Sequence, residues 1–244
     1  MDAVPYTFVD SVVELFDGKK TLNLLAEELT HSLWKAAVNV HRRNREYYTV
    51  YVREKDSATH LVAFHLGTNI CSDLKPIQKN RRFARIVTIY DQTDDHHGYL
   101  KWDHAQILGD VDAAKKLNSI ASQIEQSSYF SYQSADIMLS SLSNRVFGAI
   151  WLHYNGQTSL TFLEQQILNS PFLERIELEA KIDISFVEKF FDHWMEKGTL
   201  NFTLQLSDVE DCQTLLKRGE VTEFRQGHFR SVIKHETAKS IAIH

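Results

Sequence analysis

The sequence predicts a mixed fold of class α+β or α/β, with a helical N-terminal module, a β-hairpin region and then leucine-rich-repeat-like strand-helix units. Three observations support this prediction: apolar segments that recur at one spacing, a helix-opening signal after each of them, and three short amphipathic segments within the first 45 residues. The 244 residues are 43% hydrophobic and 24% charged. Such a chain is long and apolar enough to bury a sizeable core, as one domain or two.

Three apolar segments alternate with polar residues and recur every 26 residues. The repeated positions are those of Ile150, Ile176 and Phe202, and those of Leu152, Leu178 and Leu204. Alternation with a period of two predicts strands with one buried face. A unit of about 26 residues is within the range of leucine-rich repeats, although the strict leucine pattern is absent. An ordinary α/β sheet with a coincidental period is the alternative interpretation.

Each repeated strand is followed by a Ser or Thr with Glu three residues later, which is the pattern of a capping box. These pairs begin at Thr161, Ser185 and Ser207. After Ser185 an apolar stripe at helical spacing predicts a helix that packs on the sheet and ends near Gly198. The stripe consists of Phe186, Val187, Phe190, Phe191, Trp194 and Met195.

Residues 5–44 predict three helices. Pro5 opens the first, Asp17-Gly18 ends it, Thr21–Leu29 forms the second, and the third runs from about Ser32 to the basic segment at Arg45. Helices this short cannot bury all their apolar residues among themselves. Either the C-terminal half of the chain or a partner must therefore cover the remainder.

The middle of the chain predicts a hairpin over 46–53 and 59–66 and a further strand over 83–90. Two helices follow, over 112–126 and 134–144. Residues 240–243 predict a closing edge strand, whereas 221–237 have no clear pattern.

The N-terminal helices resemble an F-box. Val4-Pro5 takes the place of the Leu-Pro start of that family, and Phe8, Val12 and Phe16 follow at the matching spacing. Leu22–Leu25 corresponds to the leucine-rich second helix, and Trp34 to the tryptophan of the third. The chain departs from the family pattern in its initial Val and in the later position of Trp34.

A wider resemblance is to the nematode F-box and F-box-associated proteins. It is carried by the opening Met1–Val12 segment, by Trp34–Ala37 leading to Asn44–Tyr48, and by Phe190–Trp194 before an alternating strand. The resemblance implies a divergent F-box over residues 1–45 and an F-box-associated recognition domain over 46–244. It also implies a substrate receptor of an SCF-type ubiquitin ligase, which binds the SCF adaptor, and through it a cullin, as well as an unknown target protein.

Two sets of interface residues follow. The residues expected to bind the adaptor are Pro5, Phe8, Val12, Phe16, Leu22, Leu25 and Trp34. The strand face not covered by helices is often the binding surface of a repeat protein. The residues expected there, at the target interface, are His153, Glu177, Glu179, Thr203 and Gln205.

No catalytic signature is present, so we expect neither enzymatic activity nor a cofactor. The most ligand-like cluster is that of Asp91, Asp94, Asp95, His96 and His97. Neighbours in sequence rarely converge on one ion, and no second set completes four ligands, so we expect a solvated loop and no metal.

Charge and cysteine content limit the partners and the compartment. The net charge of −5 argues against a general polyanion binder, and no apolar run approaches the length of a membrane span. Two cysteines and no signal peptide favour the cytoplasm or nucleus. Two alternatives stay open: a scaffold whose N-terminal helices only cap its core, and, more weakly, a nucleic-acid-binding module using His41–Arg45 and Lys79–Arg85.

Overall fold

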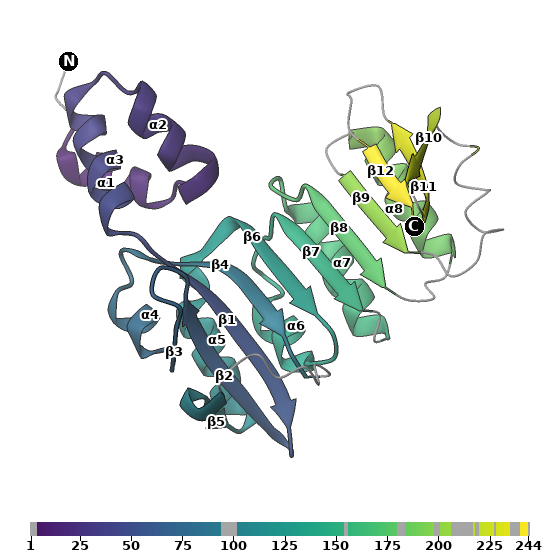
Figure 1. Ribbon diagram of the computed structural model, residues 1–244, viewed down its shortest axis with the longest axis horizontal. Coiled ribbons are helices and arrows are strands. Elements are labelled where there is room, and N and C mark those ends of the chain that lie inside the picture. The colour runs from purple at the N-terminus through teal and green to yellow at the C-terminus, as the bar shows by residue number, and fades with distance from the viewer. Residues whose placement is uncertain are drawn as a thin grey trace. The chain divides into compact units, whose positions relative to one another are not determined.

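The computed structural model describes residues 4–93, 102–153, 156–179, 184–197, 201–205, 217, 220–226, 228–234 and 240–243 (Figure 1). Within them the fold is mixed α/β, as predicted. The chain forms two compact units, Met1–Ile89 with Asp95–Ser128 and Tyr90–Asp94 with Tyr129–His244. The division falls inside strands β4 (Ala84–Asp91) and β6 (Ile124–Tyr132), and the helical module predicted over residues 1–45 is part of the first unit.

The helical module has helices at the three predicted places. Helix α1 (Tyr6–Glu14) begins after Pro5, and α3 (Ser32–Asn44) begins at the predicted Ser32. Between them a π-helical turn, η1 (Gly18–Leu22), runs directly into α2 (Asn23–Glu28). These elements have a buried core of their own, which consists of Val9, Val13, Leu22, Ala26, Ala37 and Val38.

A hairpin follows the module in the first unit. Strands β1 (Glu46–Lys55) and β2 (Ala58–His65) are antiparallel, with Lys55 opposite Ala58. Asp56 and Ser57 form the two-residue turn with φ of 54° and 60°, which is the left-handed backbone that a tight hairpin turn requires. The short strands β3 (Ile70–Ser72) and β5 (Gln106–Leu108) both pair with β2.

The remaining elements of the first unit are helical and pack near this sheet. They are α4 (Lys75–Lys79), η2 (Trp102–His104), α5 (Asp110–Ile120) and η3 (Ala121–Gln123). The strand order in this unit is β6-β4-β1-β2-β3. Gln123 Nε2 donates to the Ile77 carbonyl at 2.6 Å, which ties η3 to α4.

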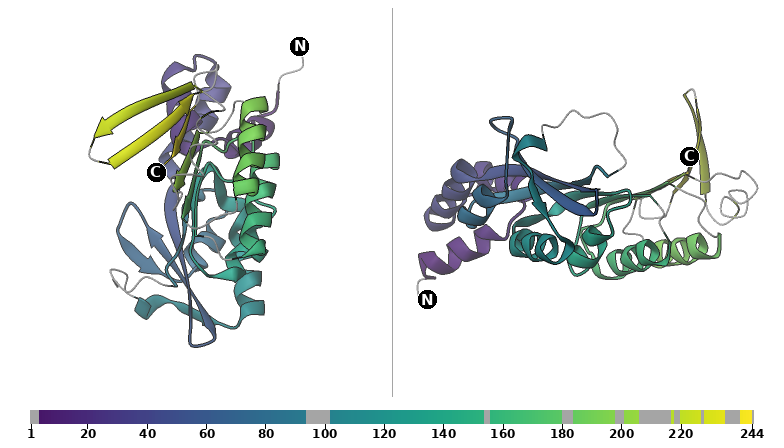
Figure 2. Two further views of the ribbon diagram at one scale, coloured as in Figure 1. Left: turned by 90° about the vertical axis from the view of Figure 1, so that its right-hand side faces the viewer. Right: turned by 90° about the horizontal axis from the view of Figure 1, so that it is seen from below.

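The second unit alternates strands with helices. After β6 come α6 (Asp136–Leu142), β7 (Ala149–His153), α7 (Gln157–Asn169), β8 (Arg175–Glu179), α8 (Ile184–Lys197) and β9 (Asn201–Gln205). Strands β6, β7, β8 and β9 are parallel neighbours in chain order. The three helices lie along one face of these strands (Figure 2).

The strands predicted at 26-residue spacing are confirmed, and their equivalent positions are aligned. Ile150 is opposite Ile176, which is opposite Phe202, and the leucines two residues later align in the same way. Ile150 and Ile176 are fully buried. On the same face Phe130 of β6 packs against Phe147 and Phe162, with ring centroids 4.7 Å and 4.9 Å away, so this face is the core that the helices cover.

The second unit ends in three strands. β10 (Glu220–Gln226) and β11 (His228–Lys234) form a hairpin in the segment that the sequence left unassigned. β12 (Ser240–Ile243), which the sequence predicted as a strand, pairs antiparallel with β11 and parallel with β9.

Three sequence predictions about helix ends are wrong. Helix α7 begins at Gln157 after Gly156, whose φ is 80°, and the Thr161 hydroxyl donates to the Gln157 carbonyl inside the helix at 3.0 Å. Thr161 is therefore not a cap, and Ser185 likewise lies inside α8. Ser207 is outside the described residues. The helix predicted over 112–126 ends at Ile120, and the missed strand β6 begins at Ile124.

Candidate protein-interaction surfaces

The first surface is an apolar stripe on helix α1. Phe8, Val12 and Leu15 follow the i, i+4, i+7 spacing, so they lie on one side of the helix. Phe8 is 56% exposed and Leu15 is 73% exposed, whereas Val12 is half-buried. The neighbouring side of α1, with Val9 and Val13, faces the core of the module. We call Phe8, Val12 and Leu15 the α1 stripe.

The residues predicted to bind an adaptor have different surroundings. Pro5 and Phe8 are exposed and Val12 is half-buried, whereas Phe16, Leu25 and Trp34 are half-buried against the core of the module. Leu22 is completely buried, so its assignment to the surface is corrected: it is a core residue. Leu15 and Leu24 are exposed apolar residues that the sequence analysis did not select.

A buried arginine fastens the end of α1 to the sheet of the first unit. Nη1 of Arg45 donates to the Phe16 carbonyl at 2.6 Å and to Glu125 Oε1 at 3.1 Å. Nη2 donates to the carbonyls of Val13 and Glu14 at 3.2 Å and 3.1 Å. Carbonyls at the end of a helix have no partner inside it and favour a cation nearby. Arg45 thus provides both the hydrogen bonds and the charge.

The same carboxylate holds the turn that follows α1. The amide of Gly18 donates to Glu125 Oε1 at 3.1 Å, and the Ser127 hydroxyl donates to Asp17. Asp17 also accepts the Lys20 amide at 2.8 Å, which caps η1. We call Arg45, Glu125, Asp17 and Ser127 the buried polar network. It joins the helical module to strand β6.

Other basic residues of the two basic groups also contact acceptors of this chain. Arg85 is buried and donates to the Glu14 carbonyl at 3.0 Å. Arg82 binds both carboxylate oxygens of Asp10 at 2.8 Å, and the buried His41 lies 3.1 Å from the same carboxylate. These contacts pair several basic side chains with acceptors of the same chain, so they weigh against a broad nucleic-acid-binding surface.

The position of Glu125 makes stability depend on pH. Burial raises the pKa of its carboxyl to about 7, the Asp17 carboxylate adds to this, and Arg45 opposes it. An acid whose pKa in the folded state exceeds its ordinary value of 4.5 stabilises the fold in its neutral form. That contribution is present below about pH 4.5 and is lost as the pH rises through about 7.

We expect the Glu125→Gln variant to become more stable relative to the parent chain as the pH rises from about 5 to about 8. The glutamine oxygen still accepts the bonds from Gly18 and Arg45, but it carries no charge. The difference should grow by up to about 3 kcal/mol, measured as the free energy of unfolding in urea at each pH. Parallel pH profiles for the two proteins would contradict this prediction.

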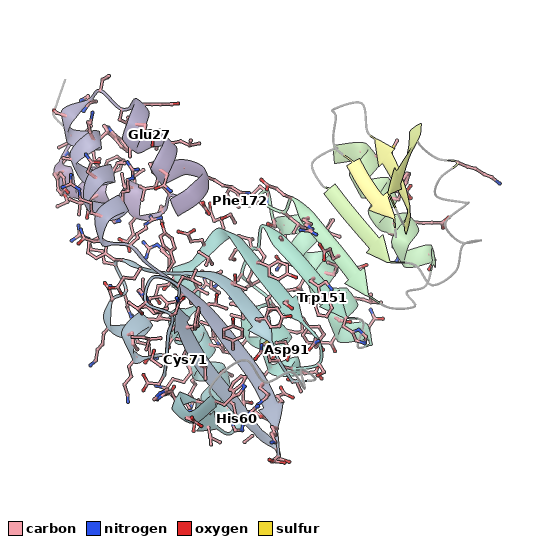
Figure 3. The ribbon with its side chains drawn as sticks, viewed as in Figure 1. Glu27, His60, Cys71, Asp91, Trp151 and Phe172 are labelled. Carbon is pink, nitrogen blue, oxygen red and sulfur yellow. The ribbon has the colours of Figure 1, made fainter. Side chains whose placement is uncertain are left out.

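The second surface is the face of the second unit opposite its helices. Tyr129 of β6, Trp151 of β7 and Glu177 of β8 alternate with the buried residues of their strands and therefore lie on this face. Trp151 is labelled on β7 in Figure 3. Trp151 and Glu177 are opposite each other in adjacent strands, and Arg175 forms an ion pair with Glu177. We call this side the open sheet face.

Two of the residues predicted to bind a target, His153 and Glu177, have described side chains on this face. His153 is exposed, and the Glu177 side chain is 23% exposed. Glu179 and Gln205 align with His153, and Thr203 aligns with Glu177, although the side chains of Glu179, Thr203 and Gln205 are outside the described residues. Tyr129 was not predicted because β6 was not, and Trp151 was not selected although it alternates with Ile150 and Leu152 in the sequence.

The described residues contain no group of three His, Cys, Asp or Glu side chains placed to hold a metal ion. Of the acidic cluster considered above, Asp91 is fully buried and accepts four backbone N–H groups. Asp94, Asp95, His96 and His97 lie outside the described residues. None of the described helices has the length and apolar character needed to span a membrane.

A comparison with models of known protein families finds no match to this chain, and a comparison with curated proteins finds no relative.

Proposed function

We propose that this chain is a substrate-recognition adaptor of an SCF-type ubiquitin ligase, related to the nematode F-box and F-box-associated proteins. In this proposal the helical module binds the SCF adaptor, and through it a cullin, in the cytoplasm or nucleus. The open sheet face binds the target protein. The chain itself performs no chemistry and needs no cofactor.

The observation that carries the proposal is the α1 stripe. The helical module has its own buried core, yet Phe8 and Leu15 remain largely exposed beside it. Covering such side chains contributes ~1.5 to 3 kcal/mol each. Part of this is offset by the cost of association. Exposed apolar residues on a packed helix are therefore suited to contact another polypeptide.

The second unit supports the recognition half of the proposal. Strands β6 to β9 follow one another in chain order, and the helices between them lie on one face, which supports the comparison with a leucine-rich-repeat-like array. Such arrays bind partners through the strand face that the helices leave uncovered.

The test is co-purification with the SCF adaptor after co-expression. We expect the parent chain to form a complex and the double variant Phe8→Ser with Leu15→Ser to bind about a hundredfold more weakly, since two apolar contacts are lost. Thermal unfolding should be nearly unchanged, because both side chains are exposed in the free chain.

Val111→Ser is the matched control, because Val111 is 70% exposed on α5 and outside the helical module. It should bind the adaptor as the parent does. Leu22→Ser should instead lower stability, because Leu22 is in the core. A parent chain that forms no complex, or a double variant that binds normally, would refute adaptor binding.

A scaffold without adaptor binding is the second candidate, and the buried polar network favours it. Arg45 and Glu125 fasten helix α1 to the sheet of the first unit, as expected for helices that cap a core. The co-purification experiment separates the two, since a scaffold binds no adaptor. Retention on RNA or DNA that decreases with salt would favour the nucleic-acid alternative instead.

A further inference from the structure

An aromatic ring and a carboxylate lie side by side on the open sheet face. Trp151 and Glu177 occupy opposed positions of adjacent parallel strands, on the side away from the buried Ile150 and Ile176. Tyr129 of β6 is opposite Ala149, which lies two residues before Trp151 in β7. Neighbouring strands are about 4.8 Å apart, so one bound side chain can contact the indole and the carboxylate together.

Glu177 and Arg175 carry opposite charges, and both act on the neighbouring Tyr129. Burial raises the pKa of Tyr129 to about 12, and Glu177 raises it more than Arg175 lowers it. The guanidinium of Arg175, from the same chain, pairs with Glu177, and the Arg175 side chain is 59% exposed. The Glu177 carboxylate thus already binds a cation of this chain. Because Arg175 is largely exposed, a cation from a partner can replace it.

We propose that the Trp151–Glu177 pair binds an Arg or Lys side chain from a basic segment of the target protein. The cation lies against the indole, which attracts it through the ring quadrupole, and its N–H groups donate to Glu177. In the free chain Arg175 pairs with the Glu177 carboxylate, and the cation of the target displaces Arg175 from it. This inference rests on the proposed role of the open sheet face in target binding.

A protein segment fits this chemistry better than a nucleic acid. Aromatic residues on an open sheet also stack with bases, but such surfaces add cations to hold phosphates. Here Glu177 lies beside the tryptophan, and Arg175 is paired with it. A carboxylate next to the ring repels phosphate and attracts a cation.

The probe is the peptide Gly-Arg-Gly-Arg-Gly, titrated into the full chain while the indole N–H signal of Trp151 is followed by NMR. That signal is assigned by its loss in Trp151→Phe. We expect saturable binding that weakens about threefold in Glu177→Gln. Binding should strengthen about threefold in Arg175→Ala, which removes the competing internal cation.

Glu164→Gln on α7 is the control, because it changes the same charge on the helical side of the second unit. It should leave the affinity unchanged. The inference would be overturned if Gly-Glu-Gly-Glu-Gly bound equally well or if an oligonucleotide bound preferentially. It would also be overturned by unchanged affinity in Glu177→Gln or by weaker binding in Arg175→Ala. The titration contains no SCF adaptor, so failure of adaptor binding and failure of this site are observed separately.

Discussion

Replacing Arg45 by alanine is expected to destabilise the first unit by about 3 to 5 kcal/mol, the range found when one partner of a buried ion pair is removed. The side chains of Arg45 and Glu125 are 0% and 3% exposed. At pH 8, where most Glu125 carboxyls are ionised, the variant leaves that carboxylate without its cation and removes the donor to three carbonyls at the end of α1. Urea unfolding followed by circular dichroism measures the change.

Arg43→Ala is the matched control for this experiment. Arg43 lies two residues earlier, is exposed near the end of α3, and should change stability by no more than about 0.5 kcal/mol. Arg45→Lys should recover only part of the loss, because an ammonium cannot reach four acceptors with the geometry of a guanidinium. Equal stability of the Arg45→Ala and Arg43→Ala proteins would contradict a structural role for the buried polar network.

The elements that the sequence predicted well have strong local signals. Pro5 precedes α1, Asp17 and Gly18 begin the turn after it, and both follow from backbone restrictions that act within a few residues. The strands of the 26-residue units were found because Ile150 and Leu152 alternate with polar neighbours on a sheet with one buried face.

Strand β6 was missed because its buried residues are not all apolar. Glu125, Ser128 and Ser131 are each at most 5% exposed, so the alternation of hydrophobic residues is interrupted where the chain enters the sheet. Burial of Glu125 depends on Arg45, which is distant in sequence. Such a partnership has no periodicity, and the preceding helix was therefore predicted to extend to residue 126, into the start of this strand.

The exposed apolar surface of the helical module was predicted only in part, because periodicity does not show which apolar residues are buried. Helix α1 carries two adjacent apolar stripes, and periodicity alone does not decide which one faces the core. Exposure decides it: Val13 is fully buried, whereas Phe8 and Leu15 project outward. In the second helical segment Leu22 is buried and Leu24 is exposed, a distinction that the run of leucines conceals.

The second large effect is expected at Asp91, which lies at the end of β4 (Figure 3). One carboxylate oxygen accepts the amides of Gln133, Ser134 and Ala135 at 2.9, 2.7 and 2.7 Å, and the other accepts the Thr93 amide at 2.9 Å. The first three amides form the connection between β6 and α6. Since Asp91 is fully buried, no solvent replaces it in that role.

Asp91→Ala should therefore destabilise the second unit by at least about 3 kcal/mol, because hydrogen bonds to a charged acceptor contribute about 1.5 to 3 kcal/mol each and do not add fully. Asp91→Asn should lose roughly half as much, since its amide retains one acceptor oxygen but has no charge. Asp112→Ala removes an exposed carboxylate from α5 and should cost less than about 1 kcal/mol. If the Asp91 and Asp112 alanine variants unfold at the same urea concentration, the connection between β6 and α6 is held by its other contacts, and the carboxylate is dispensable.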